Sequence, residues 1–136
     1  MRTLGRNKVE RTSPISPAVD FAEHPDAPAP AGAPVTLFVC ITCGARPEGD
    51  GPSAGEALRD AAITAAGEDP GLAVAPVKCL SNCKRALSAA ITRADGWSYV
   101  FGDLGPHSAD DLVIGARLLS ASEDGLMPCR RRPDSL

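Results

Sequence analysis

The stretch VTLFVCITC, residues 35–43, decides the fold class of this 136-residue chain. Its first six residues form a continuous apolar and β-branched run, which is typical of a strand buried at the centre of a sheet. Two cysteines, Cys40 and Cys43, close the stretch with two residues between them. The sequence therefore predicts a central strand over residues 35–40 that carries a pair of thiols at its carboxyl end.

A helix and a second strand are expected next. Ser53 and Glu56 fit a capping box, and apolar residues at helical spacing follow, so the helix is predicted over residues 53–66. The run over residues 72–77 has the composition of a strand. Pro76 within it cannot donate a ladder hydrogen bond, which predicts a position at the edge of the sheet.

The remaining elements complete an α/β fold. Residues 88–93 and 97–102 flank Asp95-Gly96, a strong hairpin signal, and Ser108 is expected to cap a last helix. A β-α-β unit has a right-handed crossover with parallel strands, to which the hairpin adds antiparallel strands. We predict a thioredoxin-like β-α-β-β-β-α sandwich with a four-stranded mixed sheet.

Composition divides the chain into three parts. Residues 1–33 are expected to form a disordered extension that contains His24, because the Pro/Ala-rich end of this segment cannot bury enough apolar surface. Residues 34–122 would form the domain. Residues 123–136, which include Cys129 and the run Arg130-Arg131-Arg132, are expected to be a flexible tail with Cys129 as a free thiol.

A second pair of cysteines, Cys79 and Cys83, follows the second predicted strand in the sequence CLSNC. Neighbouring parallel strands end at the same edge of a sheet, so both pairs should meet there. Three kinds of chemistry fit four such thiols. They are a dithiol oxidoreductase, a tetrahedral zinc site and a 2Fe-2S cluster with two cysteines on each iron. Spacing alone does not choose between iron and zinc.

The dithiol oxidoreductase is the weakest of the three interpretations. One dithiol suffices for thiol exchange, so the second pair would be idle. The redox helix should also begin at the first pair, where its N-terminus would stabilise a thiolate. Here a Gly/Pro-rich loop, residues 44–52, intervenes.

The cysteine pattern, C-x2-C and C-x3-C separated by 35 residues, resembles that of the thioredoxin-like 2Fe-2S ferredoxins, although the first pair is tighter than theirs. It also resembles a bacterial family of predicted metal-binding proteins grouped with these ferredoxins. That likeness covers about residues 35–119, through VCITCG, CLSNCKR and GWSYVFGDL. The resemblance implies that Cys40, Cys43, Cys79 and Cys83 hold the cluster. It also implies electron transfer and a link to cobalamin or cobalt metabolism.

The charge of the chain bears on its partners. The net charge is -3 and no broad basic patch is present, so neither nucleic acid nor a membrane is an expected partner. Lys84 and Arg85 directly follow Cys83 and could offset cluster charge or dock an acidic redox partner. A homodimer is compatible with the sequence. His107 has no second histidine near it in a Rieske-type pattern.

The expected location is the cytoplasm, where thiols stay reduced, because no signal-peptide stretch is present. No nucleophile elbow, phosphate loop or dinucleotide motif occurs in the sequence. An electron carrier is therefore a better expectation than an independent enzyme.

Overall fold

The computed structural model describes residues 32–44 and 49–136. Almost all of the predicted N-terminal extension, with His24, lies outside the described residues. The elements, in chain order, are β1 (Val35–Cys40), α1 (Ala54–Ala66), β2 (Leu72–Val77), the 3-10 turn η1 (Cys83–Arg85), β3 (Ala89–Arg93), β4 (Ser98–Phe101), α2 (Ser108–Ala121) and the 3-10 turn η2 (Cys129–Arg131). No helix in the described part of the chain is both long and apolar enough to cross a membrane.

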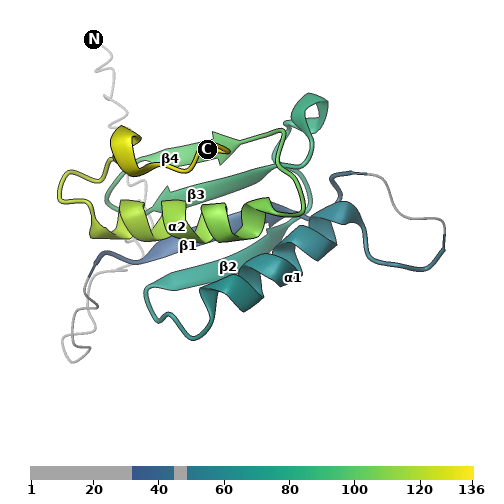
Figure 1. Ribbon diagram of the computed structural model, residues 1–136, viewed down its shortest axis with the longest axis horizontal. Coiled ribbons are helices and arrows are strands. Elements are labelled where there is room, and N and C mark those ends of the chain that lie inside the picture. The colour runs from purple at the N-terminus through teal and green to yellow at the C-terminus, as the bar shows by residue number, and fades with distance from the viewer. Residues whose placement is uncertain (1–31, 45–48) are drawn as a thin grey trace, which may run out of the picture.

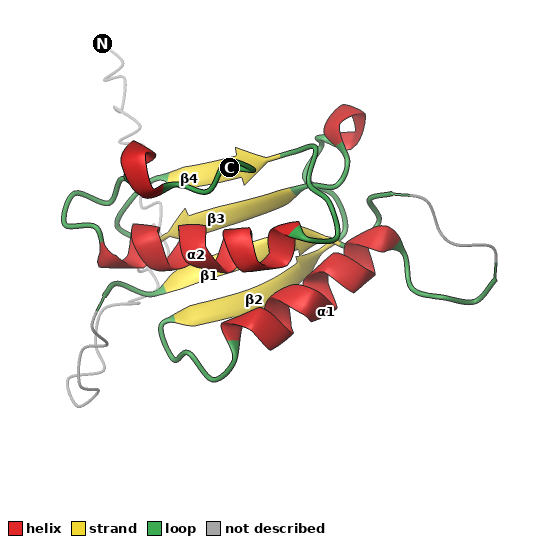
Figure 2. Ribbon diagram, viewed as in Figure 1, coloured by secondary structure: helices red, strands yellow, loops and turns green. Residues whose placement is uncertain are grey.

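The four strands form one mixed sheet in the order β2-β1-β3-β4. β1 is parallel to β2 and antiparallel to β3, and β4 is antiparallel to β3. Figure 1 shows α1 and α2 side by side on the same face of this sheet, and Figure 2 shows the two layers by element type. The strand order and directions confirm the predicted thioredoxin-like α/β fold.

The central position of β1 follows from its sequence. Val35, Leu37 and Val39 alternate along the strand and are buried, and they belong to the same core cluster as Leu58 of α1 and Leu112 of α2. An alternating set of apolar residues on one face of a strand gives one continuous core with the helices above it. β2 lies at the edge of the sheet, as the proline within it predicted.

The capping box that predicted α1 is present. The Ser53 hydroxyl accepts a hydrogen bond from the Glu56 backbone N–H at 3.1 Å, and the Glu56 carboxylate accepts one from the Ser53 N–H at 2.7 Å. The Ser53 hydroxyl also donates to the carbonyl oxygen of Ile41 at 2.5 Å. The start of α1 is thereby bound to the loop between the first two cysteines.

The cap of α2 differs from the prediction. Ser108 is the first residue of the helix, and the preceding His107 occupies the N-cap position without a side-chain cap hydrogen bond. The Ser108 hydroxyl instead accepts from the Gly105 backbone N–H at 3.0 Å, outside the helix. The hydroxyl therefore stabilises the entering turn rather than the helix terminus.

The C-terminal residues, predicted to form a flexible tail, pack against the domain instead. Met127 is buried, and its backbone N–H donates to the Tyr99 hydroxyl at 3.0 Å. The guanidinium of Arg132 lies 5.5 Å from the centre of the Tyr99 ring. The Ser135 hydroxyl donates to the Asp111 carboxylate of α2 at 2.6 Å. These contacts add the chain end to the folded domain.

Candidate metal centre

The first cysteine pair is held by the end of β1. The Cys40 backbone N–H donates to the carbonyl oxygen of Ser88 at 3.0 Å, and that of Ile41 donates to Val77 at 2.9 Å. These bonds continue the pairing of β1 with both of its neighbours. The side chains of Cys40 and Cys43 are 1% and 6% exposed. The pair is therefore fixed in the backbone of the sheet and shielded from solvent.

The second pair lies in the connection between β2 and β3, and both of its cysteines are exposed. The sulfurs of Cys79 and Cys83 are 3.7 Å apart. Two thiolates on one tetrahedral metal at about 2.3 Å would be separated by about 3.8 Å. The pair thus already has the spacing of two ligands of one metal ion.

A left-handed backbone conformation helps to shape the second pair. Ser81 has a φ of 58°, and its N–H donates to the Cys79 sulfur at 3.2 Å. Backbone N–H groups directed at ligand sulfurs stabilise the thiolate form and tune a bound centre. The short, polar Ser81-Asn82 pair within CLSNC suits such a turn, because small polar residues tolerate this conformation better than bulky ones.

The structure brings the two pairs to the same end of the sheet. The Cys40 sulfur lies 3.5 Å from the carbonyl oxygen of Lys78, which also accepts a hydrogen bond from the Thr42 hydroxyl. The backbone of Leu80, a residue of CLSNC, is among the groups that lower the pKa of the Cys40 thiol. The backbone therefore places both cysteine segments at the carboxyl ends of the parallel strands β1 and β2, as the sequence predicted.

Ser88 links the two cysteine segments and was not singled out from the sequence. It is 1% exposed, and its hydroxyl donates to the carbonyl oxygen of Arg85 at 3.1 Å. Its backbone and hydroxyl also favour the thiolate form of Cys43, although burial prevails and the pKa of that thiol is raised. A single serine at the start of a strand carries no distinguishing pattern, so its role follows only from the tertiary structure.

Each pair contains a thiol that resists ionisation. Burial, together with the hydrogen bond and charge of Cys40, raises the pKa of Cys43. The hydrogen bond and charge of Cys79 raise the pKa of Cys83. Burial also opposes ionisation of Cys40, but hydrogen bonds from Cys43 and Thr42 outweigh it and lower the pKa of that thiol. Neighbouring thiolates that repel one another in this way gain from a cation between them.

Two glycines permit the close packing around this site. A Cβ at Gly55 would lie 2.1 Å from the carbonyl oxygen of Cys40, and the Gly55 N–H donates to that of Cys43 at 3.0 Å. A Cβ at Gly102 would lie 2.6 Å from the Cβ of Arg85, in η1. The first turn of α1 and the end of β4 therefore both approach the cysteine loops more closely than a larger residue allows.

The four cysteines do not surround one common point in the structure. Across residues 32–44 and 49–136, no group of three or more Cys, His, Asp or Glu side chains is gathered closely enough to hold a single metal ion. A 2Fe-2S cluster places two ligands on each of two irons, so it asks for two close pairs a cluster width apart. Cys79 and Cys83, with sulfurs 3.7 Å apart, form one such pair.

The other candidate residues do not join these four. Cys129 opens η2, at the opposite end of the sheet from the cysteine pairs (Figure 1), and the nearest polar contact of its sulfur is with Arg132 at 3.8 Å. His107 is exposed and precedes α2. No hydrogen bond of the described residues joins His107 to a cysteine.

The sequence places the chain in a known family. Residues 37–136 match the family described as protein of unknown function (DUF1636). The chain belongs to this family. The matched region begins within β1 and includes all four cysteines, both helices and the packed chain end. Among curated proteins, no match to the chain reaches significance.

Solved structures of a thioredoxin-like 2Fe-2S ferredoxin from Aquifex aeolicus are similar to this chain. One has 19% identity and a TM-score of 0.45, covering 60% of this chain and 77% of that chain. A crystal structure of the wild type has the same identity and TM-score, covering 60% and 82%. A cysteine-to-serine variant also has 19% identity, with a TM-score of 0.44 and coverage of 72% and 95%. Similarity at this level assigns no ligand to this chain.

Proposed function

We propose that this protein is an electron carrier with a 2Fe-2S cluster, in which Cys40 and Cys43 hold one iron and Cys79 and Cys83 hold the other. The observation that carries the proposal is the convergence of two thiol pairs at one end of the sheet, with the Cys79 and Cys83 sulfurs 3.7 Å apart. Such a cluster takes up and releases one electron at a time. The ferredoxin-like resemblance of the cysteine pattern supports the choice of iron.

The surroundings of the thiols suit a redox centre. The backbone N–H of Ser81 donates to the Cys79 sulfur, and the backbone of Leu80 favours ionisation of the Cys40 thiol. Donors of this kind stabilise negative charge on sulfur and raise the reduction potential of a bound cluster. One pair is buried and the other is exposed, so the centre would be held firmly on one side and be accessible on the other.

A zinc-binding structural or metal-handling module is the alternative. Four thiolates also satisfy a closed tetrahedral zinc site. Structural zinc typically stabilises small domains with a poor core, whereas β1, α1 and α2 form one continuous hydrophobic core here. This observation favours the cluster. A dithiol oxidoreductase would leave one pair unused.

Anaerobic purification tests the proposal. We expect a brown protein with two irons and two acid-labile sulfides per chain, visible absorbance that dithionite bleaches, and an electron paramagnetic resonance signal in the reduced form only. A colourless protein with one zinc per chain, purified from cells supplied with iron, would contradict the electron carrier and support the zinc-binding module. A protein that binds neither metal would contradict both and favour the dithiol oxidoreductase.

Single substitutions test the ligand set. Serine in place of Cys40, Cys43, Cys79 or Cys83 should reduce the iron content or shift the visible spectrum, because a hydroxyl is a poor substitute for a thiolate. Cys129→Ser is the matched control, since this exposed cysteine lies at the other end of the sheet, and its iron content and spectrum should equal those of the wild type. Equal spectra for Cys79→Ser and Cys129→Ser would contradict the four-cysteine site.

The physiological role is the more specific part of the proposal. The family resemblance suggests a reductant for cobalt in cobalamin metabolism, acting in the cytoplasm, where the thiols stay reduced. Mixing the reduced protein with cob(II)alamin in a stopped-flow instrument tests this role. Reoxidation of the cluster with formation of cob(I)alamin is the expected result. A reduced cluster that persists unchanged would direct the search to another acceptor.

A further inference from the structure

The loop that carries the exposed cysteine pair has the opposite charge from the chain as a whole. The chain has a net charge of -3, yet residues 78–85 contain Lys78, Lys84 and Arg85 and no acidic residue. The chain has only three lysines, and two of them stand in these eight residues, next to Cys79 and Cys83. The basic charge is therefore concentrated beside the exposed thiols.

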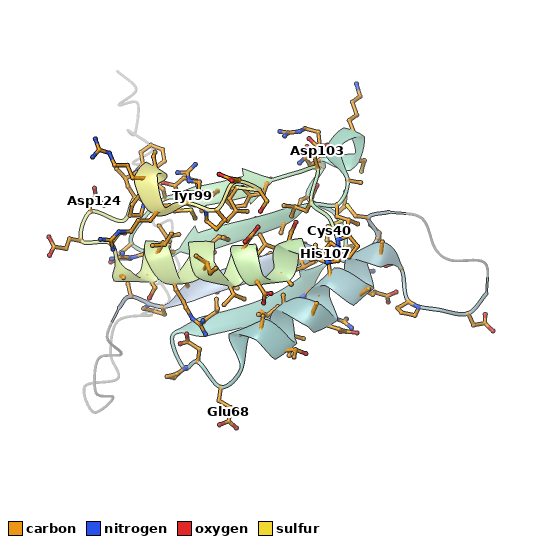
Figure 3. All side chains as sticks on the ribbon, in the orientation of Figure 1. Cys40, Glu68, Tyr99, Asp103, His107 and Asp124 are labelled. Atoms are coloured by element: carbon orange, nitrogen blue, oxygen red, sulfur yellow. The ribbon has the colours of Figure 1, made fainter. Side chains whose placement is uncertain are left out.

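Two of these three cations are not neutralised. Arg85 forms an ion pair with Asp103, with 2.6 Å between Nε and Oδ2, at the end of the molecule where Figure 3 labels Asp103. The other ion pairs of the described residues involve Arg59, Arg93 and Arg117. Lys78 and Lys84 are exposed and form no ion pair within the described part of the chain. Both charges therefore remain available to a partner.

The backbone fixes where these lysines stand. The carbonyl oxygen of Lys78 accepts a hydrogen bond from the Thr42 hydroxyl and lies 3.5 Å from the Cys40 sulfur. Lys84 lies in η1, directly after Cys83. The two lysines therefore flank the exposed pair. A lysine carries its charge at the end of a flexible four-carbon stem, so both ammonium groups can reach a molecule that docks on the exposed pair.

We propose that the redox partner of this protein presents an acidic surface that docks on the loop of residues 78–85 and is recognised by Lys78 and Lys84. The inference rests on the proposed electron-transfer function, because it takes the exposed thiol pair as the side on which electrons are exchanged. The first pair is buried, so this loop is the short route to the centre. Opposite charges at such a surface accelerate encounter and orient the partner.

Small inorganic ions of opposite charge provide the kinetic test. The reduced protein is oxidised by hexacyanoferrate(III), an anion, or by tris(phenanthroline)cobalt(III), a cation. We expect the rate with the anion to fall as salt rises, because salt screens the attraction. Lys78→Gln with Lys84→Gln should lower that rate about tenfold at low salt and raise the rate with the cation. Lys78→Arg with Lys84→Arg should keep the wild-type rates.

Two exposed arginines provide the matched control. Arg130→Gln with Arg131→Gln removes the same charge from η2, at the other end of the sheet (Figure 1), and should leave both rates near the wild type. Rates that respond equally to the lysine and arginine substitutions would show an effect of net charge alone. Rates that are unchanged by the lysine substitutions would overturn the docking surface but would not contradict the proposed 2Fe-2S cluster.

A second measurement does not depend on the cluster. Reductive methylation with 13C-formaldehyde labels the few lysines, and hexacyanochromate(III), a paramagnetic and redox-inert anion, broadens the signals of those that it approaches. The Lys78 and Lys84 signals, assigned with the glutamine variants, should broaden with hexacyanochromate(III) and not with hexaamminechromium(III). Absence of this difference would overturn the inference even for a protein that carries no iron. Loss of iron with the difference intact would overturn only the proposed function.

Discussion

Gly55→Ala is the most direct test of the contact between α1 and the cysteine site. The added Cβ would lie 2.1 Å from the carbonyl oxygen of Cys40, which is backbone and cannot rotate away. Forcing an extra carbon into a packed site costs about 1 to 3 kcal/mol. Alanine also favours a helix over glycine by up to about 1 kcal/mol, which offsets part of the cost. Since 2.1 Å is far inside van der Waals contact, the upper end of that cost applies, and we expect a net loss of about 2 kcal/mol in the free energy of unfolding.

The assay is urea unfolding of the metal-free, reduced protein, followed by far-ultraviolet circular dichroism. Removing the metal prevents ligand binding from adding to the measured stability. Gly105→Ala is the control, because a Cβ at that position meets no atom within 4 Å and its φ is not in the left-handed region. If Gly55→Ala unfolds at the same urea concentration as the control, α1 does not approach Cys40 as closely as described.

Three further predictions concern the chain end, the serine link and acid stability. Met127→Ala should lower the free energy of unfolding by about 2 to 4 kcal/mol in urea unfolding, because the side chain is 2% exposed, whereas Leu126→Ala, at a side chain 41% exposed, should have little effect. Ser88→Ala should cost about 1 to 2 kcal/mol in the same assay, since the hydroxyl bonds to two carbonyl groups. It should also lower the yield of iron-loaded protein. The hydrogen bond from Arg93 holds the pKa of Asp95 below its ordinary value of 3.8, so this pair stabilises the fold above that pH and is lost as the pH falls through the lower folded value. Asp95→Asn should accordingly flatten the loss of stability in acid titrations below about pH 4, and an unchanged slope would contradict the pairing.

Local sequence signals were sufficient for most of the fold. The apolar run of β1, the capping box of α1 and the Asp95-Gly96 turn each predict an element that the structure contains. Pro76 predicted the edge position of β2 for a physical reason, its missing N–H. The meeting of the cysteine pairs then followed from parallel strand order alone, without any information on side-chain contacts.

The parts that sequence could not predict depend on tertiary contacts. Residues 123–136 lack periodicity and contain three arginines, so nothing local indicates that Met127 is buried or that its N–H bonds to Tyr99. Ser88 and Ser108 likewise differ from other serines only in their neighbours. The hydrogen bond from the Ser81 N–H to the Cys79 sulfur likewise depends on a local backbone conformation that the sequence does not single out.

The connection between β2 and β3 has a consequence for metal exchange. Its regular structure is limited to η1, a 3-10 turn of three residues that begins at Cys83, and Cys79 lies before this turn, whereas Cys40 ends a strand that is paired on both sides. Segments with few backbone bonds open far more often than the central strands of a sheet. Amide hydrogens of residues 79–84 should therefore exchange with solvent much faster than those of β1. An ion could then enter or leave by opening of one loop while the rest of the domain stays folded.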